Sequence, residues 1–457
     1  MTMKIGTLVA AVSLTFGNVR AANPAEEMLP QECANPSVKY IQRTMRKLSE
    51  STAEKPATVR ICFYGQSIVA QEWTHLVISN LVSRFPTARI ICDKPAIGGY
   101  PSPHLIRTAE PDLYPLYPDL LFFHVYGPLD KYEGIVREMR RRTTSEIILW
   151  SSHLNEIEAA DPAAKLVQRD KRTLGIRSIA ERHHCMFIDL NRKWAELLLG
   201  SDMKAGALVS GVHLRKNALP IYAGMLTGEL VRLPDAPDLT VSGGVITTVK
   251  PEVREGKMIV PFVGNRLLAV SDGTGKAGAS ARVLLDGKPL SECPELWAAT
   301  RPSAGPMWMP CVNRVAFERT PVAETWTLTY PDGIDSNRSV RARFTLSGSV
   351  TGPDGEGVTT EDFLSKSGRI RIMAEDHAAA KWQCGMFRKP LKPGFVVRWQ
   401  TYPLFAETYS PQPAGVETRL VQNCRNDAHV LEIVPNTGCA VGDLGLGSFV
   451  SFAPPGE

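Results

Sequence analysis

Two patterns of apolar and polar residues divide this chain. Between residues 58 and 232, short apolar runs alternate with longer amphipathic segments, whereas the rest shows short alternating runs separated by turn residues. We expect strands at residues 58–64, 89–92, 119–126, 146–151 and 186–190, and helices at 71–85, 102–109, 131–142, 163–183, 191–199 and 217–231. Strands that alternate with helices of this length predict an α/β domain whose parallel sheet is covered on both faces.

A linker at residues 233–238, with the sequence Leu-Pro-Asp-Ala-Pro-Asp, ends this rhythm. The chain beyond it has short strand-like runs and Asp-Gly pairs at Asp272-Gly273, Asp286-Gly287, Asp332-Gly333 and Asp354-Gly355. Asp-Gly is favoured in tight hairpins, so we expect a β-sandwich-type region. The predicted units are residues 239–346 and 358–457, on either side of a glycine-rich stretch at 348–357. The second unit is either a separate β-rich unit or a continuation of the first.

The start of the chain has the features of a secretory signal. A basic residue precedes an apolar stretch from Ile5 to Phe16, and the small residue Ala21 follows soon after. A membrane-spanning helix needs about 20 apolar residues, so this shorter stretch indicates a cleavable signal peptide at residues 1–21. We therefore expect an exported protein, secreted or periplasmic, with an N-terminal lead-in at residues 22–57.

Candidate chemistry lies at the ends of two predicted elements. The first strand runs into Gly65-Gln66-Ser67, which places a serine at the carboxyl edge of the sheet, where open α/β folds bind ligands. Late in the domain, His213 follows Ser210-Gly211-Val212. A serine and a histidine form a nucleophile and its base if they meet in space. Each also has a structural alternative, because serine is a common helix N-cap and a lone histidine is usually a surface or hydrogen-bonded residue.

Together these motifs resemble those of the SGNH (GDSL-type) hydrolases over residues 58–232. Gly65-Gln66-Ser67 matches the block that carries the nucleophile, Gly99 matches the oxyanion-hole glycine, and His213 matches the histidine of the last block. The resemblance implies a flavodoxin-like three-layer fold, with Ser67 as nucleophile and His213 as base. It also implies an oxyanion hole that includes the amides of Ser67 and Gly99. No cofactor is implied, since ester hydrolysis needs only water.

Two blocks depart from the family pattern. Gly127-Pro128-Leu129-Asp130 stands where the family has Gly-x-Asn-Asp, so one oxyanion donor is missing. Ser210 stands where the family has the aspartate that orients the histidine. A backbone carbonyl can orient an imidazole instead, so a Ser-His pair is chemically sufficient. Ser210 and His124 are possible auxiliary residues, although a buried strand position is the commoner role for His124.

The resemblance therefore implies an exported serine esterase or deacetylase that acts on ester groups, above all acetyl groups, of carbohydrates. One alternative is a catalytically degenerate SGNH scaffold that binds glycans, because the family's Asn and Asp are both substituted. Another is an enzyme with its site in the β half, using Asp362, Glu375 and Asp376 as glycan-cleaving carboxylates. Adjacent residues on a strand point to opposite faces, which disfavours that last arrangement.

Composition narrows the partners. The net charge is +5 at pH 7 with dispersed basic residues, which does not indicate a nucleic-acid partner. The densest basic group, Arg137 with Arg140, Arg141 and Arg142, fits the solvated end of a helix. No cluster has the spacing of a zinc site, so no metal is expected. The expected partner is an acylated carbohydrate or a small ester, with no membrane span, and the oligomeric state is left open.

The β half contains candidate disulfides and candidate stacking aromatics. Among the nine cysteines, Cys293 with Cys311 and Cys424 with Cys439 are the candidate pairs. Five aromatic residues could stack on a sugar, although Trp and Tyr on strands are more often core: Trp297, Trp308, Trp382, Trp399 and Tyr402.

Overall fold

The computed structural model describes residues 35–168, 170–234, 243–335 and 340–456. Residues Ser37–Glu457 form one compact unit, which contains all the described sheets and the candidate site. The predicted signal peptide at residues 1–21 lies outside the described residues. Among the helices of the described ranges, none combines the length and apolar character that crossing a lipid bilayer requires.

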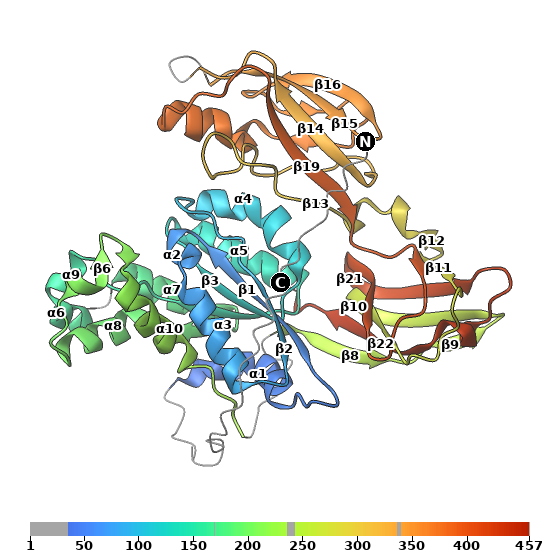
Figure 1. Ribbon diagram of the computed structural model, residues 1–457, viewed down its shortest axis with the longest axis horizontal. Coiled ribbons are helices and arrows are strands. Elements are labelled where there is room, and N and C mark those ends of the chain that lie inside the picture. The colour runs from blue at the N-terminus through green and yellow to red at the C-terminus, as the bar shows by residue number, and fades with distance from the viewer. Residues whose placement is uncertain (1–34, 169, 235–242, 336–339, 457) are drawn as a thin grey trace, which may run out of the picture. The chain divides into compact units, whose positions relative to one another are not determined.

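A parallel five-stranded sheet forms the centre of the N-terminal half (Figure 1). Its strands are β1 (Thr58–Gly65), β2 (Arg89–Asp93), β3 (Leu120–His124), β4 (Glu146–Trp150) and β5 (Met186–Ile188). They lie in the order β2-β1-β3-β4-β5, and every neighbouring pair is parallel. This is the flavodoxin-like strand order, so the predicted α/β fold is confirmed.

Alternate strand residues fill a core on each face of the sheet. Phe63 and Trp150 are fully buried on one face, and Tyr64 and Phe123 are fully buried on the other. The first core is covered by α1 (Gln42–Ser49), α3 (Trp73–Arg84), α8 (Leu190–Leu199) and α10 (Leu219–Thr227), and the second by α4 (Ser102–Asp112), α5 (Leu129–Arg142) and α7 (Lys171–Arg182). The near-continuous apolar runs of the sequence thus belong to strands buried on both faces.

The prediction of a single helix at residues 163–183 is wrong, because two helices occupy this range. These are α6 (Pro162–Val167) and α7, which begins at Lys171. The Asp170 carboxylate accepts a hydrogen bond from the Thr173 amide at 2.8 Å. Asp170 is therefore the N-cap of α7, a position that interrupts the first helix and starts the second.

The C-terminal half contains two larger antiparallel sheets, which confirms the predicted β-sandwich-type region. The eight-stranded sheet comprises β8 (Val245–Val249), β9 (Glu252–Arg254), β10 (Lys257–Ser271), β11 (Ala281–Leu285), β12 (Lys288–Pro289), β20 (Thr408–Tyr409), β21 (Glu417–Pro435) and β22 (Leu446–Ala453). The five-stranded sheet comprises β13 (Trp297–Ala299), β14 (Glu324–Tyr330), β15 (Arg343–Gly348), β16 (Gly352–Val358) and β19 (Phe395–Pro403). The second sheet is inserted in the chain between β12 and β20 of the first.

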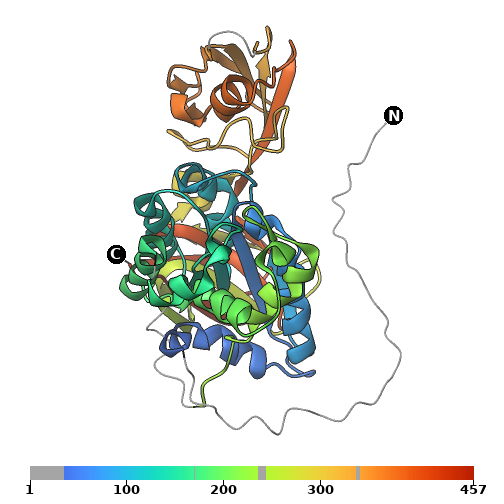
Figure 2. The ribbon, with the colours of Figure 1, turned by 90° about the vertical axis from the view of Figure 1, so that its left-hand side faces the viewer.

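The glycine-rich stretch at 348–357 forms part of the five-stranded sheet. β15 and β16 pair as an antiparallel hairpin, with Gly348 opposite Gly352 and Leu346 opposite Gly355. The division that the sequence predicts at this stretch therefore falls inside one sheet. Each large sheet has its own apolar core, and the π-helix η9 (Ala379–Met386) packs on the core of the five-stranded sheet (Figure 2).

The predicted disulfides are wrong. Every cysteine in the described part of the chain is a free thiol, including Cys293, Cys311, Cys424 and Cys439. Cys311 is buried in the core of the five-stranded sheet, whereas Cys293 packs against the core of the eight-stranded sheet. Their closeness in sequence therefore does not carry over into space.

Candidate active site

Ser67 lies at the carboxyl edge of the parallel sheet. β1 ends at Gly65, Gln66 is buried, and the four-residue helix α2 (Ser67–Ala70) begins at the serine itself. The indole Nε1 of Trp73 donates to the carbonyl oxygen of Ile68 at 2.6 Å, which ties this short helix to α3. The strand-turn-helix geometry leaves the Ser67 side chain half-buried at the surface of the domain.

Gly65 has no room for a side chain. A Cβ at this position would lie 2.1 Å from the carbonyl oxygen of His124 and 2.5 Å from Cγ2 of Val69. Gly65 and His124 are register partners on β1 and β3. The glycine two residues before Ser67 is therefore needed because the turn into α2 passes directly over the neighbouring strand.

His213 meets Ser67. Its Nε2 lies 2.9 Å from Oγ of Ser67, a distance within which the hydroxyl can donate to the imidazole. His213 belongs to a short hairpin of β6 (Val209–Ser210) and β7 (His213–Leu214), in which Ser210 is its register partner. The structure thus brings together the two residues that the sequence singled out, 146 positions apart.

The side chain of Gln71 holds this hairpin against the nucleophile helix. Its Nε2 donates to the carbonyl oxygen of Leu214 at 2.8 Å, and its Oε1 accepts from the amide of Leu214 at 3.2 Å. Gln71 follows α2 directly, so one amide side chain fixes the backbone next to His213 relative to Ser67. The sequence analysis missed this residue, because a glutamine after a short helix carries no local signal.

A second polar clamp holds the tip of the hairpin. The Glu156 carboxylate accepts from the Gly211 amide at 3.0 Å, and the Glu156 amide donates to the Gly211 carbonyl at 3.1 Å. Within the described residues, Nδ1 of His213 has no hydrogen-bond partner, and the Ser210 hydroxyl makes no hydrogen bond to the imidazole. The orientation of the imidazole thus comes from its backbone, which Gln71 and Glu156 hold in place.

The loop with Gly98 and Gly99 lies beside Ser67. The Ile97 amide donates to the Gly65 carbonyl at 3.0 Å, which ties the loop to the end of β1. A Cβ on Gly98 would lie 3.8 Å from Cβ of Ser67. Gly99 has φ +77°, and within the described ranges its amide donates to no acceptor. The amide of Ser67 is likewise an orphan donor, as the first in a helix.

The block after β3 supplies no donor to this site. At the position of the family's asparagine, the Leu129 side chain packs on Gly175 of α7. Gly127 has φ +115°, and a Cβ there would lie 2.7 Å from Oγ of Ser102, at the start of α4. This turn therefore serves close packing between helices α4, α5 and α7.

His124 is fully buried between strands. Its Nδ1 contacts the carbonyl oxygen of Trp150 at 3.1 Å and its Nε2 contacts Oγ of Ser152 at 3.3 Å, while its ring stacks on that of Trp150. Burial lowers the pKa of His124 to about 3, so the ring is neutral at physiological pH. These contacts occupy both ring nitrogens, and the auxiliary role considered for His124 stays a prediction.

The α/β domain has the flavodoxin-like parallel sheet that the resemblance to the SGNH hydrolases implies. Its strand order, the serine at the end of β1 and the histidine after β5 are those that the sequence motifs predict. No protein-family model matches the chain, and no curated protein matches it.

Several solved structures are similar to the chain. A two-domain esterase active on acetylated mannans is 12% identical, covers 92% of this chain and 95% of its own, and has a TM-score of 0.35. An acetylxylan esterase from Geobacillus stearothermophilus is 20% identical over 38% of this chain and 94% of its own, with a TM-score of 0.33. A protein described as a GDSL-like lipase from Parabacteroides merdae is 16% identical over 38% of this chain and 95% of its own, and its TM-score is also 0.33. Likenesses this distant say nothing about what this chain does.

The three acids of the β half hold structure instead of forming a pocket. Asp376 is buried and forms a two-pronged ion pair with Arg107, whose Nη1 also contacts Glu375 at 2.6 Å. The Asp362 carboxylate accepts from the Ala374 amide at 2.9 Å. Such contacts neutralise the carboxylates and fix the five-stranded sheet to α4, so they argue against the glycan-cleaving alternative.

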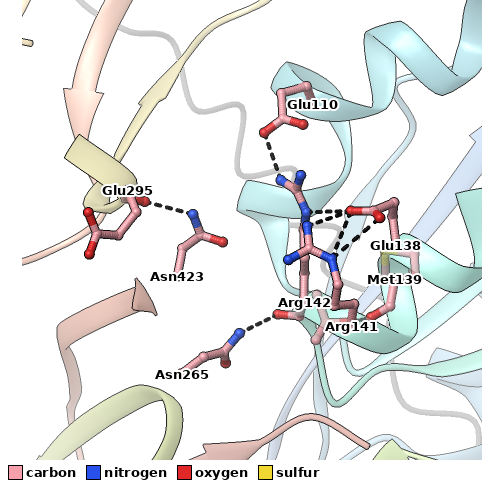
Figure 3. A network of polar contacts seen from close by, with 9 residues as sticks. Glu110, Glu138, Met139, Arg141, Arg142, Asn265, Glu295 and Asn423 are labelled. Carbon is pink, nitrogen blue, oxygen red and sulfur yellow. Dashed lines mark hydrogen bonds and ion pairs between the residues drawn. The ribbon is translucent and has the colours of Figure 1, made fainter. Parts of the chain in front are cut away.

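The arginine cluster at the end of α5 is less solvated than we predicted. Arg140 is buried, and its guanidinium donates to three backbone carbonyls, including that of Ser145 at 2.6 Å. Arg142 pairs with Glu110 at 2.7 Å and with Glu138 at 3.0 Å (Figure 3). Ser145 lies in the turn after α5, and His183 and His184 lie in the turn after α7, so Arg140 supplies donors to carbonyls that follow both helices.

A cavity of about 760 Å³ lies beside these arginines. Asn265 of β10 donates to the last carbonyl of α5 at 2.8 Å, and Asn423 of β21 donates to the carbonyl of Glu295 at 2.7 Å (Figure 3). Both asparagines line the cavity. Neither Ser67 nor His213 lines this cavity. Within the described residues, no three His, Cys, Asp or Glu side chains are grouped so that they could hold a metal ion.

Proposed function

We propose that the protein is a serine esterase in which Ser67 is the nucleophile and His213 the general base. The observation that carries the proposal is the 2.9 Å contact between Oγ of Ser67 and Nε2 of His213 at the open edge of the sheet. His213 takes the proton as Oγ attacks the ester carbonyl, and returns it to the alcohol that leaves. Water then attacks the acyl-serine, with His213 again as base, and releases the acid and the free serine.

The oxyanion is held by backbone amides in this scheme. Gly99 and Ser67 offer amides that donate to nothing else in the described part of the chain. With Leu129 at the position of the family's asparagine, one donor is absent. The loss of one such donor costs about 2.7–4 kcal/mol of transition-state stabilisation, or about 10²- to 10³-fold in kcat. We therefore expect an active enzyme with a lower kcat than an enzyme whose oxyanion hole has all its donors.

The missing aspartate is compensated by the backbone of the hairpin. Ser210 cannot supply a carboxylate, but Gln71 and Glu156 hold the segment on either side of His213 through four hydrogen bonds. A histidine that is positioned in this way needs less help from a third side chain, because its approach to Ser67 is set by the chain. The scheme requires neither metal nor cofactor.

Acyl groups on carbohydrates, above all acetyl groups, are the proposed substrate. The support is the resemblance of the motifs together with an exposed tryptophan beside the site, Trp308. Export is proposed from the signal peptide predicted at residues 1–21. The alternative remains a glycan-binding protein on a degenerate scaffold, which the substituted Asn and Asp positions favour.

Hydrolysis of 4-nitrophenyl acetate by the purified protein tests the proposal. We expect Ser67→Ala and His213→Ala each to lose about 10³-fold or more in kcat/KM. Ser201→Ala is the matched control, because this serine lies away from the site, where its hydroxyl donates to the Leu197 carbonyl at 2.7 Å and accepts from the Met203 amide at 3.4 Å. A fluorophosphonate probe should label Ser67 alone. No turnover and no labelling in the unmutated protein would instead favour the binding-protein alternative.

A further inference from the structure

Trp308 belongs to the β half of the chain but lies beside the nucleophile. Its indole Nε1 donates to the carbonyl oxygen of Gly98 at 2.8 Å. A Cβ on Gly98 would lie 3.4 Å from this nitrogen and 3.8 Å from Cβ of Ser67, so the indole and the serine both lie beside Gly98. Trp308 comes from the segment between β13 and β14 and thus adds a residue to the site that the α/β domain lacks.

Trp308 is 62% exposed, whereas Trp297 and Trp399 of the β half are buried. Trp297 is 9% exposed and Trp399 is 2% exposed, and both pack in the sheet cores. A tryptophan in solvent loses the free energy that burial would give it, about 25 cal/mol for each Å² of apolar surface. Its exposure at this position is therefore a feature that packing does not explain.

The segment that carries Trp308 is held firmly on both sides. The buried side chain of Gln383 accepts from the Met307 amide at 3.1 Å and donates to the carbonyl oxygen of Met309 at 3.0 Å. Met309 itself is buried in the core of the α/β domain, against Gly99. The residues on either side of Trp308 are thus fixed, and its indole is presented to solvent in a defined place.

Two further contacts anchor the same segment to the α/β domain. The guanidinium of Arg301 binds the Asp112 carboxylate through two hydrogen bonds, at 2.7 and 2.6 Å. The hydroxyl of Tyr100, one residue after Gly99, donates to the side-chain oxygen of Asn313 at 2.8 Å. Segment 301–313 is therefore fixed to the α/β domain next to the site.

The hydrogen bond to Gly98 uses the only polar group of the indole. What remains for a ligand is a flat apolar face with negative potential. A pyranose ring matches this face, because one side of the ring presents only C–H groups. A small acyl group alone would not need a platform of this size, since the acyl carbon is held at Ser67 and Gly99.

We propose that Trp308 forms a stacking subsite for the sugar ring that carries the ester, so that the leaving alcohol is part of a neutral glycan. The inference rests on the proposed function for its reaction and names the substrate class. The β half then completes the active site and acts as more than a separate binding module. Trp308 would be a specificity residue, because it touches the sugar and none of the atoms that react.

Steady-state kinetics on two kinds of substrate, one with sugar rings and one without, test the subsite. The substrates are acetylated oligosaccharides from xylan and glucomannan, compared with 4-nitrophenyl acetate. We expect Trp308→Ala to raise KM for an acetylated oligosaccharide about 5- to 10-fold, the range of an aromatic stacking contact, and to change kcat much less. The rise should exceed any change with 4-nitrophenyl acetate. Trp308→Phe keeps an aromatic face and should recover most of the affinity.

Two controls separate this subsite from its alternatives. Phe387→Ala removes another exposed aromatic of the β half, 40% exposed, and should leave both substrates unaffected. Binding of non-acetylated xylohexaose and mannohexaose to Ser67→Ala, measured by calorimetry, tests the subsite even if the esterase proposal fails. Equal losses of kcat/KM on the oligosaccharides and on 4-nitrophenyl acetate in Trp308→Ala would overturn the subsite. So would a Trp308→Ala substitution that weakens neither the binding nor the turnover of the oligosaccharides. Trp308 would then be only a structural contact to Gly98.

Discussion

The ion pair between Asp112 and Arg301 offers a measurable test of how the β half is joined to the site. Asp112 lies at the end of α4, its side chain is 4% exposed, and both its oxygens accept from Arg301. The Arg301 side chain is 30% exposed, and its Nη2 also donates to the carbonyl oxygen of Pro95 at 2.6 Å. We consider the substitution Asp112→Asn, which keeps the shape of the side chain and removes its charge.

The expected cost follows from the exposure of the two partners. Removal of one partner from a buried ion pair costs about 3–5 kcal/mol, because the other charge is left without compensation. Water reaches part of Arg301, and burial raises the pKa of Asp112 to about 6, so the fold already disfavours the ionised carboxylate. Both effects reduce this range, and we expect a cost of about 1–2 kcal/mol. The measurement belongs at pH 7.5, where the carboxylate is ionised. The double variant Asp112→Asn/Arg301→Gln should cost less than the sum of its single variants.

Urea unfolding followed by tryptophan fluorescence gives the free energy of the first unfolding transition. Asp93→Asn is the matched control, because Asp93 pairs with Arg60 at 2.7 Å while their side chains are 27% and 35% exposed. We expect this control to cost less than about 1 kcal/mol. If Asp112→Asn and Asp93→Asn destabilise the protein equally, the claim that the Arg301 contact anchors segment 301–313 is wrong.

Two further substitutions follow from the structure. Gly65→Ala would place a Cβ 2.1 Å from a backbone oxygen of β3, which cannot move without parting the strands, so we expect a loss of about 3 kcal/mol and a lower Tm; a loss under about 1 kcal/mol would contradict this. His377 is fully buried, neither ring nitrogen has a partner among the described residues, and burial lowers its pKa to about 4, below the unfolded value of about 6.5. The unfolded state then binds the extra proton between these values, so the stability is complete above pH 6.5 and declines as the pH falls toward 4. His377→Leu should remove this decline. Between pH 7 and pH 4.5, the free energy of unfolding of the variant, measured by denaturant titration, should rise by about 2 kcal/mol relative to that of the unmutated protein. If the two free energies change with pH in parallel, His377 does not cause the decline.

The sequence by itself determined the order of elements in the N-terminal half. Its apolar runs and amphipathic segments have periods that follow from local geometry, so β1 to β5 and most helices lie where the pattern predicts them. Ser67 and His213 were identifiable for the same reason, since Ser67 follows the first predicted strand and His213 precedes the last predicted helix of the domain. Their contact at 2.9 Å depends on the separate hairpin of β6 and β7, which Gln71 and Glu156 hold beside the end of the parallel sheet.

The tertiary structure alone decided how the site is held and what surrounds it. Gln71 clamps Leu214 across 143 residues, and Trp308 reaches Gly98 across 210 residues. Contacts over such separations leave no period and no spacing in the chain. The same reason explains the insertion of one β sheet within another and the free thiols of Cys293 and Cys311, whose nearness in sequence gave no information on their packing. Local periodicity shows which face of a helix or strand is buried. Only the folded chain specifies which distant residues pack against that face.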